Sequence, residues 1–329
     1  MGADMPGAIL PGGSGTGEHF VSVSVVIPAF RAATTLRRTV ESCLATLSPS
    51  QVVIVLDGPD AEMEHVARSF PAVQVVVLPV NQGAPVCRNA GLNLVRTRYV
   101  IFLDADDYVE DGLLEAMAAA GDADHADLIF GPFAFEMPDG RRERHLPLQR
   151  FRDLSAGTVM KRWLGGHYIP PCAVLWRSDY VRALGGWDET LAKNQDGDII
   201  HRALMNGARI AAAADGLGVY VQDDNPGRIT RRHSARTLQS QLCVLDKIRV
   251  RLGDLAFDPS RDLALAYYAL ARLAYSNAEE AIGATAEGHA RRLGFDGQHG
   301  SFGHVVMANV LGLRGKQRLA RFVKSLAQG

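Results

Sequence analysis

The segment Tyr99-Val100-Ile101-Phe102-Leu103-Asp104-Ala105-Asp106-Asp107 decides the fold of this chain. Its first five residues are typical of a strand buried in a parallel sheet. Its three aspartates follow at the carboxyl end of that strand, where open α/β folds bind ligands. Clustered carboxylates favour Mg²⁺ or Mn²⁺, which commonly bind together with the phosphates of a substrate. The segment therefore predicts a metal-assisted enzyme that acts on a phosphorylated donor.

Strand and helix patterns alternate on the N-terminal side of this segment. Apolar and β-branched runs predict strands at residues 21–27, 51–56 and 73–78. Apolar side chains at helical spacing predict helices at residues 34–47, 61–70 and 85–95. Pro28 is expected to stop the first strand. The alternation predicts a largely parallel sheet with right-handed crossovers.

The alternation continues on the C-terminal side. Helices are predicted at residues 113–120, 178–184 and 196–205, and strands at 127–135, 170–176, 209–214 and 218–221. Pro138-Asp139-Gly140 is expected at the tip of a hairpin. From Ser234 onward, Leu, Ala and Arg recur at helical spacing. We therefore expect a flexible leader at 1–19, an α/β domain at 20–230 and a helical region at 231–329.

Composition narrows the class of protein. The 329 residues have a formal net charge of −1, so bulk charge predicts no nucleic-acid binding. The four cysteines are far apart and lack metal-ligand spacing, which favours buried thiols in a reducing compartment. The sequence contains no signal-peptide pattern and no apolar run of the ~18 residues that span a bilayer. We therefore expect a cytoplasmic protein.

Polar residues also follow two other predicted strands. Asp57 ends one of them, where a carboxylate can bind a base or a ribose, although Leu56-Asp57-Gly58-Pro59 is also an ordinary turn. Asn81-Gln82-Gly83 ends the next, and Gly83 permits a tight turn. Arg88, in the helix behind that turn, is expected either to face a phosphate or to pair with one of the aspartates.

A second acidic set lies further along the chain, in Gly185-Gly186-Trp187-Asp188-Glu189 and Gln195-Asp196-Gly197-Asp198. Asp196 and Asp198 begin a predicted helix, where aspartate is also common as a cap and as a partner of the helix dipole. A carboxylate held there beside a donor site can act as a general base for an incoming hydroxyl. Both interpretations stay open at this point.

Together these motifs resemble those of the family 2 glycosyltransferases. The match comprises Val25-Val26-Ile27-Pro28-Ala29-Phe30, Asp57-Gly58, Asn81-Gln82-Gly83 with Arg88-Asn89-Ala90-Gly91, Phe102-Leu103-Asp104-Ala105-Asp106-Asp107 and the second acidic set, in this order. The resemblance covers roughly residues 20–230 and does not reach the helical third. It implies the GT-A fold and the transfer of a sugar from a nucleotide donor with inversion.

The resemblance also implies roles for individual residues. The nucleotide-binding set that it implies is Pro28, Ala29, Asp57, Asn81, Gly83, Arg88 and Asp104. Asp57 would bind the base, commonly uracil. Of the two candidate metal ligands, Asp106 rather than Asp104 would be the direct ligand of Mg²⁺ or Mn²⁺. Asp196 would be the catalytic base, which takes the proton of an acceptor hydroxyl while the metal stabilises the departing diphosphate.

The sequence departs from the family pattern at two places. Gln195 stands where the family usually has an acid before the base, which removes a negative charge beside Asp196. Residues 221–230 lack the usual histidine, so Asp224 or the later His233 is expected to complete the metal or diphosphate site.

Several side chains are candidates for a lid or for acceptor contacts. Arg228, Arg231, Arg232 and His233 form a cationic loop that is expected either to fold over the diphosphate or to remain solvated. The acceptor candidates are His167, Tyr168, Trp187 and Asp188. Trp187 serves equally well as a core residue.

The C-terminal segment is basic and amphipathic. Its cations are interleaved with apolar residues, with no acid among them: Arg314, Lys316, Arg318, Arg321 and Lys324. Such a helix can lie on an anionic membrane, which would place the protein at the inner face of that membrane. Packing against the preceding helices is the alternative. Homodimer formation and acceptor capture stay open for this region.

The expected function is that of an inverting, metal-dependent glycosyltransferase. Its donor would be a UDP-sugar, and its acceptor a hydroxyl on a glycan, a lipid-linked saccharide or a small metabolite. One alternative is a GT-A binding module that has lost turnover, for which Gln195 and the missing histidine are the reasons. The other is a sugar nucleotidyltransferase, which is disfavoured because no Gly-rich loop with a following Lys is present.

Overall fold

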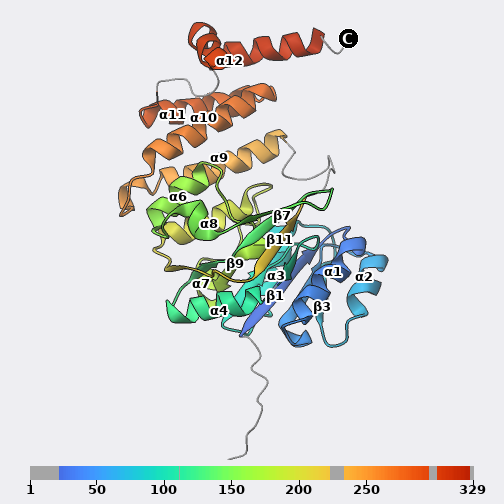
Figure 1. Ribbon diagram of the computed structural model, residues 1–329. Helices are drawn as coiled ribbons and strands as arrows, with labels where there is room; N and C mark the ends of the chain where they lie inside the picture. The colour runs from blue at the N-terminus through green and yellow to red at the C-terminus, as the bar shows by residue number, and fades with distance from the viewer. Residues whose placement is uncertain (1–21, 111, 223–232, 296–301, 327–329) are drawn as a thin grey trace, which may run out of the picture.

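The computed structural model describes residues 22–110, 112–222, 233–295 and 302–326 (Figure 1). A seven-stranded sheet lies at its centre, with strand order β10-β6-β9-β4-β1-β2-β3. These strands are β1 (Val23–Ala29), β2 (Val52–Leu56), β3 (Gln74–Val77), β4 (Tyr99–Phe102), β6 (Leu128–Phe130), β9 (Val174–Arg177) and β10 (Ile210–Ala212). The pairings are parallel except for those of β9 with β4 and β6. The predicted, largely parallel sheet is therefore observed.

A second sheet of four strands begins directly after the acidic segment. Its order is β5-β11-β7-β8, and its strands are β5 (Tyr108–Glu110), β7 (Phe133–Glu136), β8 (Arg142–His145) and β11 (Leu217–Val221). The predicted hairpin tip joins β7 to β8, where Met137 N donates to Arg141 O over 2.8 Å. The chain thus leaves the main sheet at Asp104 and enters the second sheet at Tyr108.

Helices cover both faces of the main sheet. They are α1 (Ala33–Leu44), α2 (Ala61–Arg68), α3 (Ala84–Leu92), α4 (Leu113–Ala123), α5 (Pro147–Phe151), α6 (Ala156–Leu164), α7 (Ser178–Ala183) and α8 (Gln195–Met205). Alternate residues of β1 point to opposite faces, so Val25 packs with α1, α2 and α4 while Val26 packs on the side of α6 and α8. Both faces are therefore buried, as the continuous apolar strands predict.

Helices α9 (Ala235–Arg249), α10 (Ser260–Ser276), α11 (Glu280–Arg292) and α12 (Phe302–Leu326) form the C-terminal region. Figure 1 shows them stacked beyond α6 and α8. Leu238 of α9, Tyr267 of α10 and Ala286 of α11 belong to the same hydrophobic cluster as Val26 of the sheet. The domain division expected at residue 231 stays a prediction, and it lies outside the described residues.

Two expectations about strands were wrong. Pro28 does not stop β1, which continues to Ala29. Ala29 O accepts from Asp57 N on the β2 side, so Pro28 faces the β4 side, where the last ladder bond runs from Leu103 N to Val26 O. A proline is tolerated there because its missing N–H lies at the end of the β1–β4 ladder.

The strand expected at 127–135 is two strands in different sheets. The chain passes between them at Gly131 and Pro132. A Cβ on Gly131 would lie 2.7 Å from Leu113 Cδ1, so a larger residue at this crossing would require the Leu113 side chain to move. Among the described residues, no helix is long and apolar enough to cross a membrane.

Candidate active site

The acidic segment lies at the carboxyl end of β4, beside the ends of β1 and β2. Asp104 and Asp106 are partly exposed, whereas Asp107 is fully buried. Asp107 Oδ1 accepts from Val221 N of β11 over 2.9 Å. Burial raises the pKa of the Cys172 thiol well above its usual value, and the nearby charges of Asp107, Asp104 and Asp106 add to that rise. The segment thus presents two carboxylates outward and uses the third to hold the second sheet.

Arg88 of α3 lies between the two acidic sets. Its side chain is only 3% exposed, and its Nη2 donates to Asp104 Oδ1 over 2.7 Å. Its Nη1 lies 3.3 Å from Asp196 Oδ1. Burial opposes the charge of Arg88, but Asp196 and Asp104 outweigh it and raise the pKa of the guanidinium. Arg88 therefore pairs with both aspartates, and its buried Nε has no hydrogen-bond partner among the described residues.

Asp57 shapes the turn that precedes α3. It is 5% exposed, and it accepts from Gln82 N over 2.7 Å and from Gly83 N over 2.9 Å. Gly83 has φ of +98°, which favours glycine, and it lies directly before the first residue of α3. Asn81 is exposed at the same turn. Asp57 therefore stabilises the turn at residues 81–83, and its contact with a base stays a prediction.

Asp196 lies in the first turn of α8, opposite the end of β4. Its side chain is 41% exposed. Trp187 Nε1 donates to its Oδ1 over 3.4 Å. Burial raises the pKa of Asp196 above its usual value; Arg88 opposes this rise and Asp104 adds to it. Gln195, the residue before it, donates to Leu191 O over 3.0 Å and so stabilises the loop.

Trp187 forms one wall of a mainly apolar pocket below Asp196. The pocket is partly open to solvent and is lined by Phe102, Trp163, Ile169, Pro171, Val174, Trp176, Trp187, Asp196, Ile199 and Ile200. The rings of Trp187 and Phe102 are 4.1 Å apart between centroids. Trp187 is 4% exposed, so it serves as a core residue and as a pocket wall at once.

Asn89 fixes the backbone of Trp187. Its Oδ1 accepts from Trp187 N over 2.8 Å, and its Nδ2 donates to Trp187 O over 2.9 Å. The neighbouring Gly186 has φ of +67°, and a Cβ there would lie 2.4 Å from Asn89 Oδ1. This pair of hydrogen bonds therefore joins α3 directly to the loop that precedes α8.

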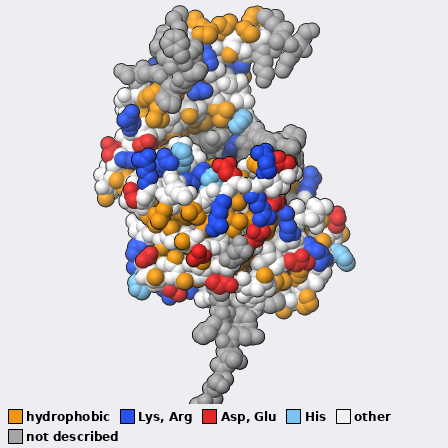
Figure 2. All heavy atoms as spheres, viewed as in Figure 1, with side chains coloured by type: hydrophobic (Ala, Val, Ile, Leu, Met, Phe, Trp, Pro, Cys, Tyr) orange, Lys and Arg blue, Asp and Glu red, His pale blue; other side chains and the backbone are white. Residues whose placement is uncertain are grey.

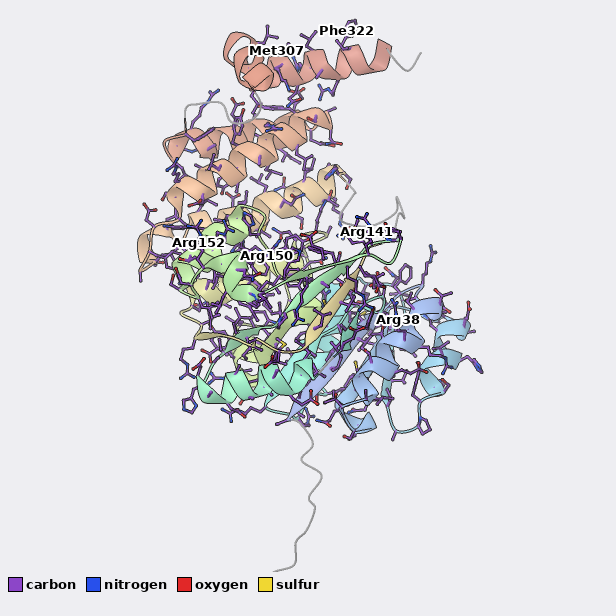
Figure 3. All side chains as sticks on the ribbon, in the orientation of Figure 1. Arg38, Arg141, Arg150, Arg152, Met307 and Phe322 are labelled. Atoms are coloured by element: carbon purple, nitrogen blue, oxygen red, sulfur yellow. The ribbon has the colours of Figure 1, made fainter. Side chains whose placement is uncertain are left out.

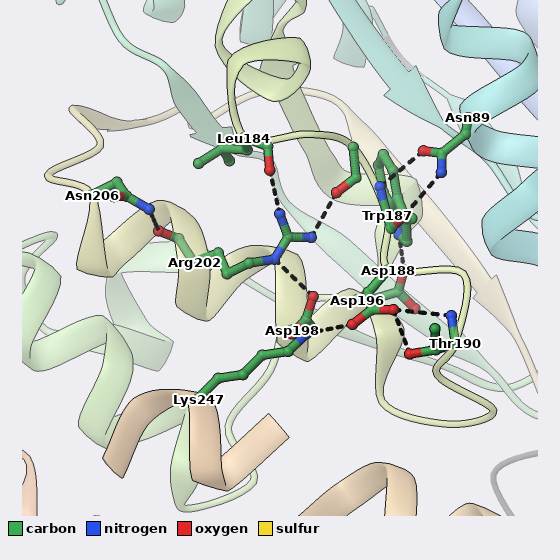
Figure 4. A network of polar contacts seen from close by, with 11 residues as sticks. Asn89, Leu184, Trp187, Asp188, Thr190, Asp196, Asp198, Arg202, Asn206 and Lys247 are labelled. Carbon is green, nitrogen blue, oxygen red and sulfur yellow. Dashed lines mark hydrogen bonds and ion pairs between the residues drawn. The ribbon is translucent and has the colours of Figure 1, made fainter. Parts of the chain in front are cut away.

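A polar network continues from this loop to the C-terminal helices (Figure 4). Lys247 of α9 donates to Asp188 Oδ2 over 2.6 Å and to Asp198 Oδ1 over 2.7 Å. Partial burial raises the pKa of Asp188, but hydrogen bonds from Lys247 and Thr190 outweigh it and lower that pKa to about 2. Asp188, expected as an acceptor or lid residue, is therefore engaged in an ion pair.

The remaining described candidates, His167, Tyr168 and His233, do not line the pocket. His167 follows α6, and burial followed by the charges of Arg162 and Arg150 lowers its pKa. Tyr168 is 40% exposed, and neither residue lines the pocket. Burial and then Lys193 lower the pKa of His233. Asp224, Arg228, Arg231 and Arg232 lie outside the described residues, so the lid stays a prediction.

A divalent metal at this site would need oxygen ligands from the protein. Among the described residues, no group of three or more His, Cys, Asp or Glu side chains could hold a metal ion. Mg²⁺, however, is commonly bound by one or two carboxylates together with substrate phosphates. Asp106 and Asp104 are two partly exposed carboxylates of that kind, although Arg88 already pairs with Asp104. The set therefore fits a metal that arrives with a diphosphate.

Two residues of the site were not singled out from the sequence. Asn89 lies in the quoted Arg88-Asn89-Ala90-Gly91 motif, and that motif was its only signal. Lys247 has none, because a lysine on an amphipathic helix is typical of a solvated face. Only the packing of α9 against the α8 region makes Lys247 part of the network.

A solved structure has the same architecture. The chain superimposes on the crystal structure of S. aureus TarS 1-349 in complex with UDP-GlcNAc with a TM-score of 0.65 and 17% identity, covering 82% of this chain and 81% of that one. The mixed α/β core with flanking helices is therefore the GT-A-like fold that the sequence resemblance implied.

The sequence comparisons give matches to glycosyltransferases. Residues 24–182 match the model described as Glycosyl transferase family 2. The chain is 28% identical to the pre-mycofactocin glycosyltransferase of Mycobacterium tuberculosis, over 59% of this chain and 42% of the relative. It is 30% identical to the succinoglycan biosynthesis protein ExoU of Rhizobium meliloti, over 57% of this chain and 58% of the relative. The matches thus span about half the length of these curated relatives.

Proposed function

We propose that this protein is an inverting glycosyltransferase that moves a sugar from a UDP-sugar to an acceptor hydroxyl, with Asp196 as the general base. The observation that carries the proposal is the buried Arg88, which pairs with Asp104 over 2.7 Å and with Asp196 over 3.3 Å. One cation thus joins the strand end that would bind the donor to the carboxylate that would accept the proton.

The surroundings of Asp196 suit proton transfer. A pKa raised above the usual value brings a carboxylate nearer to the pKa that is ideal for a base at neutral pH. Arg88 opposes that rise and favours the ionised form, which a base needs before it can accept a proton. The partly exposed side chain of Asp196 can be reached by an acceptor hydroxyl.

The donor diphosphate would bind near Arg88 and the acidic segment. The buried Nε of Arg88 is an N–H donor that a phosphate oxygen could accept from. A divalent ion held by Asp106 with Asp104 would stabilise the negative charge on the leaving diphosphate. Pro28, Ala29, Asp57, Asn81 and Gly83 would hold the nucleoside.

The relatives support the donor and the acceptor class. TarS, which has this fold, was crystallised with UDP-GlcNAc. The chain is also 33% identical over 121 residues to the poly(ribitol-phosphate) beta-N-acetylglucosaminyltransferase TarP of Staphylococcus aureus. We therefore propose UDP-GlcNAc as the first donor to test, and a hydroxyl of a polysaccharide, a lipid-linked saccharide or a small metabolite as the acceptor.

A thermal-shift and product-release experiment tests the proposal. The melting temperature is measured with UDP-GlcNAc, UDP-glucose and GDP-mannose, each with and without Mn²⁺, because a ligand that binds the native state raises stability. A panel of saccharide acceptors is then added to the same mixtures, and UDP release is measured by coupled assay. We expect the UDP-sugars to stabilise the protein more than GDP-mannose does, with a larger shift in Mn²⁺, and to release UDP.

The outcomes separate the candidate functions. Stabilisation by UDP-sugars without UDP release, across a panel of saccharide acceptors, would favour the binding module, for which Gln195 is the motivating departure. Pyrophosphate exchange with a sugar phosphate and UTP would favour the nucleotidyltransferase. No stabilisation by any nucleotide sugar would contradict the proposal.

We also infer that α12 contacts an anionic membrane surface. Arg318 and Arg321 pair with Glu280 of α11 over 3.0 and 3.1 Å, and Arg314 pairs with the same carboxylate. These ion pairs hold one side of α12 against α11, while the side chains of Arg314 and Arg318 on that side remain about half exposed. The other side is apolar and exposed, and Figure 3 places Met307 and Phe322 on it, away from α10 and α11. Its exposed apolar residues are Met307, Leu311, Leu319, Phe322 and Val323.

The positive charge of α12 favours an anionic bilayer over a second copy of the chain as the partner of this exposed face. Residues 302–326 contain five Lys and Arg and no Asp or Glu, and Glu280 neutralises one of these cations. A second copy of the chain would bring a second set of cations against the first. An anionic bilayer instead attracts cations while it accepts apolar side chains. Figure 2 shows hydrophobic side chains on this outer end of the molecule.

A further inference from the structure

Lys247 connects the C-terminal helices to both segments that surround the candidate base. Its Nζ lies 2.6 Å from Asp188 Oδ2 and 2.7 Å from Asp198 Oδ1 (Figure 4). Asp188 follows Trp187 directly in the loop before α8, and Asp198 lies in the first turn of α8, two residues after Asp196. The ammonium group of Lys247 therefore links the loop before α8 to the first turn of α8.

The two carboxylates differ in how strongly they depend on Lys247. Asp198 is 1% exposed and also accepts from Arg202 Nε over 2.8 Å. Arg202 in turn donates to Leu184 O and Gly186 O over 2.7 and 2.6 Å, so α8 keeps an anchor without Lys247. Asp188 pairs with Lys247, and it also accepts hydrogen bonds from the backbone N–H and the hydroxyl of Thr190 in its own loop. Asn89 still holds the backbone of Trp187 without Lys247, so removing Lys247 would free the part of the loop that begins at Asp188 more than it frees the helix.

The loop carries the contact with the base. Trp187 Nε1 donates to Asp196 Oδ1, and the Trp187 ring lies 5.7 Å from the guanidinium carbon of Arg88. Trp187 is therefore in contact with both members of the Arg88 and Asp196 pair. A shift of the loop would move a hydrogen-bond donor away from Asp196.

We propose that Lys247 is a positioning residue that holds Trp187 against Asp196 by binding Asp188 and Asp198 together. The proposal rests on the proposed function of Asp196 as the base. It makes the helical region part of the catalytic unit, because α9 supplies a side chain that the α/β residues cannot replace. Lys247 itself touches neither donor nor acceptor.

Hydrogen exchange tests the positioning without any assay of activity. The variant is Lys247→Met, which keeps much of the apolar stem and removes the charge. Its matched control is Arg249→Met in the same helix, because Arg249 pairs with Asp246 of α9 over 3.0 Å and is exposed to a similar extent. We expect amide exchange in residues 186–194 to become at least roughly 10-fold faster in Lys247→Met, and to stay unchanged in Arg249→Met.

Steady-state kinetics tests the consequence for catalysis. We expect kcat to fall roughly 10- to 100-fold in Lys247→Met, as expected for a displaced catalytic contact. The KM for the UDP-sugar should stay within about 2-fold. The proposed donor contacts lie at the ends of β1, β2 and β4, so Lys247→Met should not weaken donor binding. Lys247→Arg should restore most of kcat. Asp188→Asn should lower kcat, and adding Lys247→Met to it should lower kcat little further.

The outcomes separate this inference from the proposed function. Unchanged exchange of residues 186–194 in Lys247→Met would overturn the positioning role, even if the wild type proved inactive. Faster exchange with unchanged kcat would overturn the effect on catalysis. A wild type that releases no UDP would count against the proposed function instead, while the exchange comparison would still decide whether Lys247 holds the loop.

Discussion

At the scale of single residues, the charge of Arg88 is central. Its guanidinium is buried, while the two carboxylates that it binds are partly exposed. The sequence left open whether Arg88 faces a phosphate or an aspartate. The answer depends on α3 and α8 meeting at one sheet edge, and spacing along the chain contains no information about that contact.

Replacing Arg88 should change the pH dependence of transfer. The charge of Arg88 lowers the pKa of Asp196, so Arg88→Met should raise that pKa further. Because the base must be ionised, the acidic limb of kcat/KM should move to higher pH. The limb should move less in Arg88→Lys, which keeps the charge. A pH-rate profile with the same limb in Arg88→Met as in the wild type would contradict this account.

Two neighbouring aspartates should respond to substitution in opposite ways. Asp107→Ala removes a fully buried carboxylate and its hydrogen bond from the partly buried Val221 N–H, so it should lower the free energy of unfolding by about 1–3 kcal/mol. The Mn²⁺ concentration that half-activates UDP release should not change. Asp106→Ala should leave the unfolding midpoint in urea nearly unchanged and should raise the Mn²⁺ requirement. The opposite result would contradict this account, because it would assign the metal to Asp107 and the structural contact to Asp106.

At the scale of elements, the alternating part of the fold could be predicted from the sequence. The strands that became β1 to β4 and the helices between them were predicted because apolar periodicity is strong there. The run at 127–135 was misread because β6 and β7 are equally apolar, and only the tight space around Gly131 separates them. Helices α5 and α6 were not predicted, since they are short and mix polar with apolar residues.

The loop before α8 allows a test with two adjacent glycines. Gly185 and Gly186 both have positive φ, so alanine strains the backbone at either position. A Cβ meets nothing within 4 Å at Gly185, whereas at Gly186 it lies 2.4 Å from Asn89 Oδ1. Gly186→Ala should therefore cost about 1–3 kcal/mol more in urea unfolding than Gly185→Ala, because it also breaks the hydrogen bonds of Asn89. Equal losses in the two variants would show that Asn89 does not fix this loop.

At the scale of the whole molecule, the helical region shares its hydrophobic core with the α/β region. One hydrophobic cluster extends from Val26 of the sheet to Ala286 of α11, and Lys247 extends the polar network of the site in the same direction. The sequence indicated helices after Ser234, but it gave no sign of this shared core. Periodicity reveals that a helix has an apolar face and leaves open which surface covers it.

The exposed face of α12 leads to a binding prediction. Full-length protein should co-sediment with vesicles that contain phosphatidylglycerol more than with pure phosphatidylcholine vesicles, and less at high salt. The double variant Leu319→Ser with Val323→Ser should lose this binding. The control variant Val250→Ser, which replaces an exposed valine directly after α9, should still bind the vesicles. Undiminished binding by the double variant would contradict the inference, and a dimer lost in that variant would assign the face to a second copy.

The most direct test of the account is the effect of Asp196→Asn on transfer and on donor binding. Wild-type protein and the variant are compared for UDP release from UDP-GlcNAc with Mn²⁺ and a saccharide acceptor, and for UDP-GlcNAc affinity by calorimetry. If Asp196 is the general base, kcat should fall by about 10²- to 10⁴-fold while the donor Kd stays similar. A variant that retains the wild-type kcat would show that another group removes the acceptor proton.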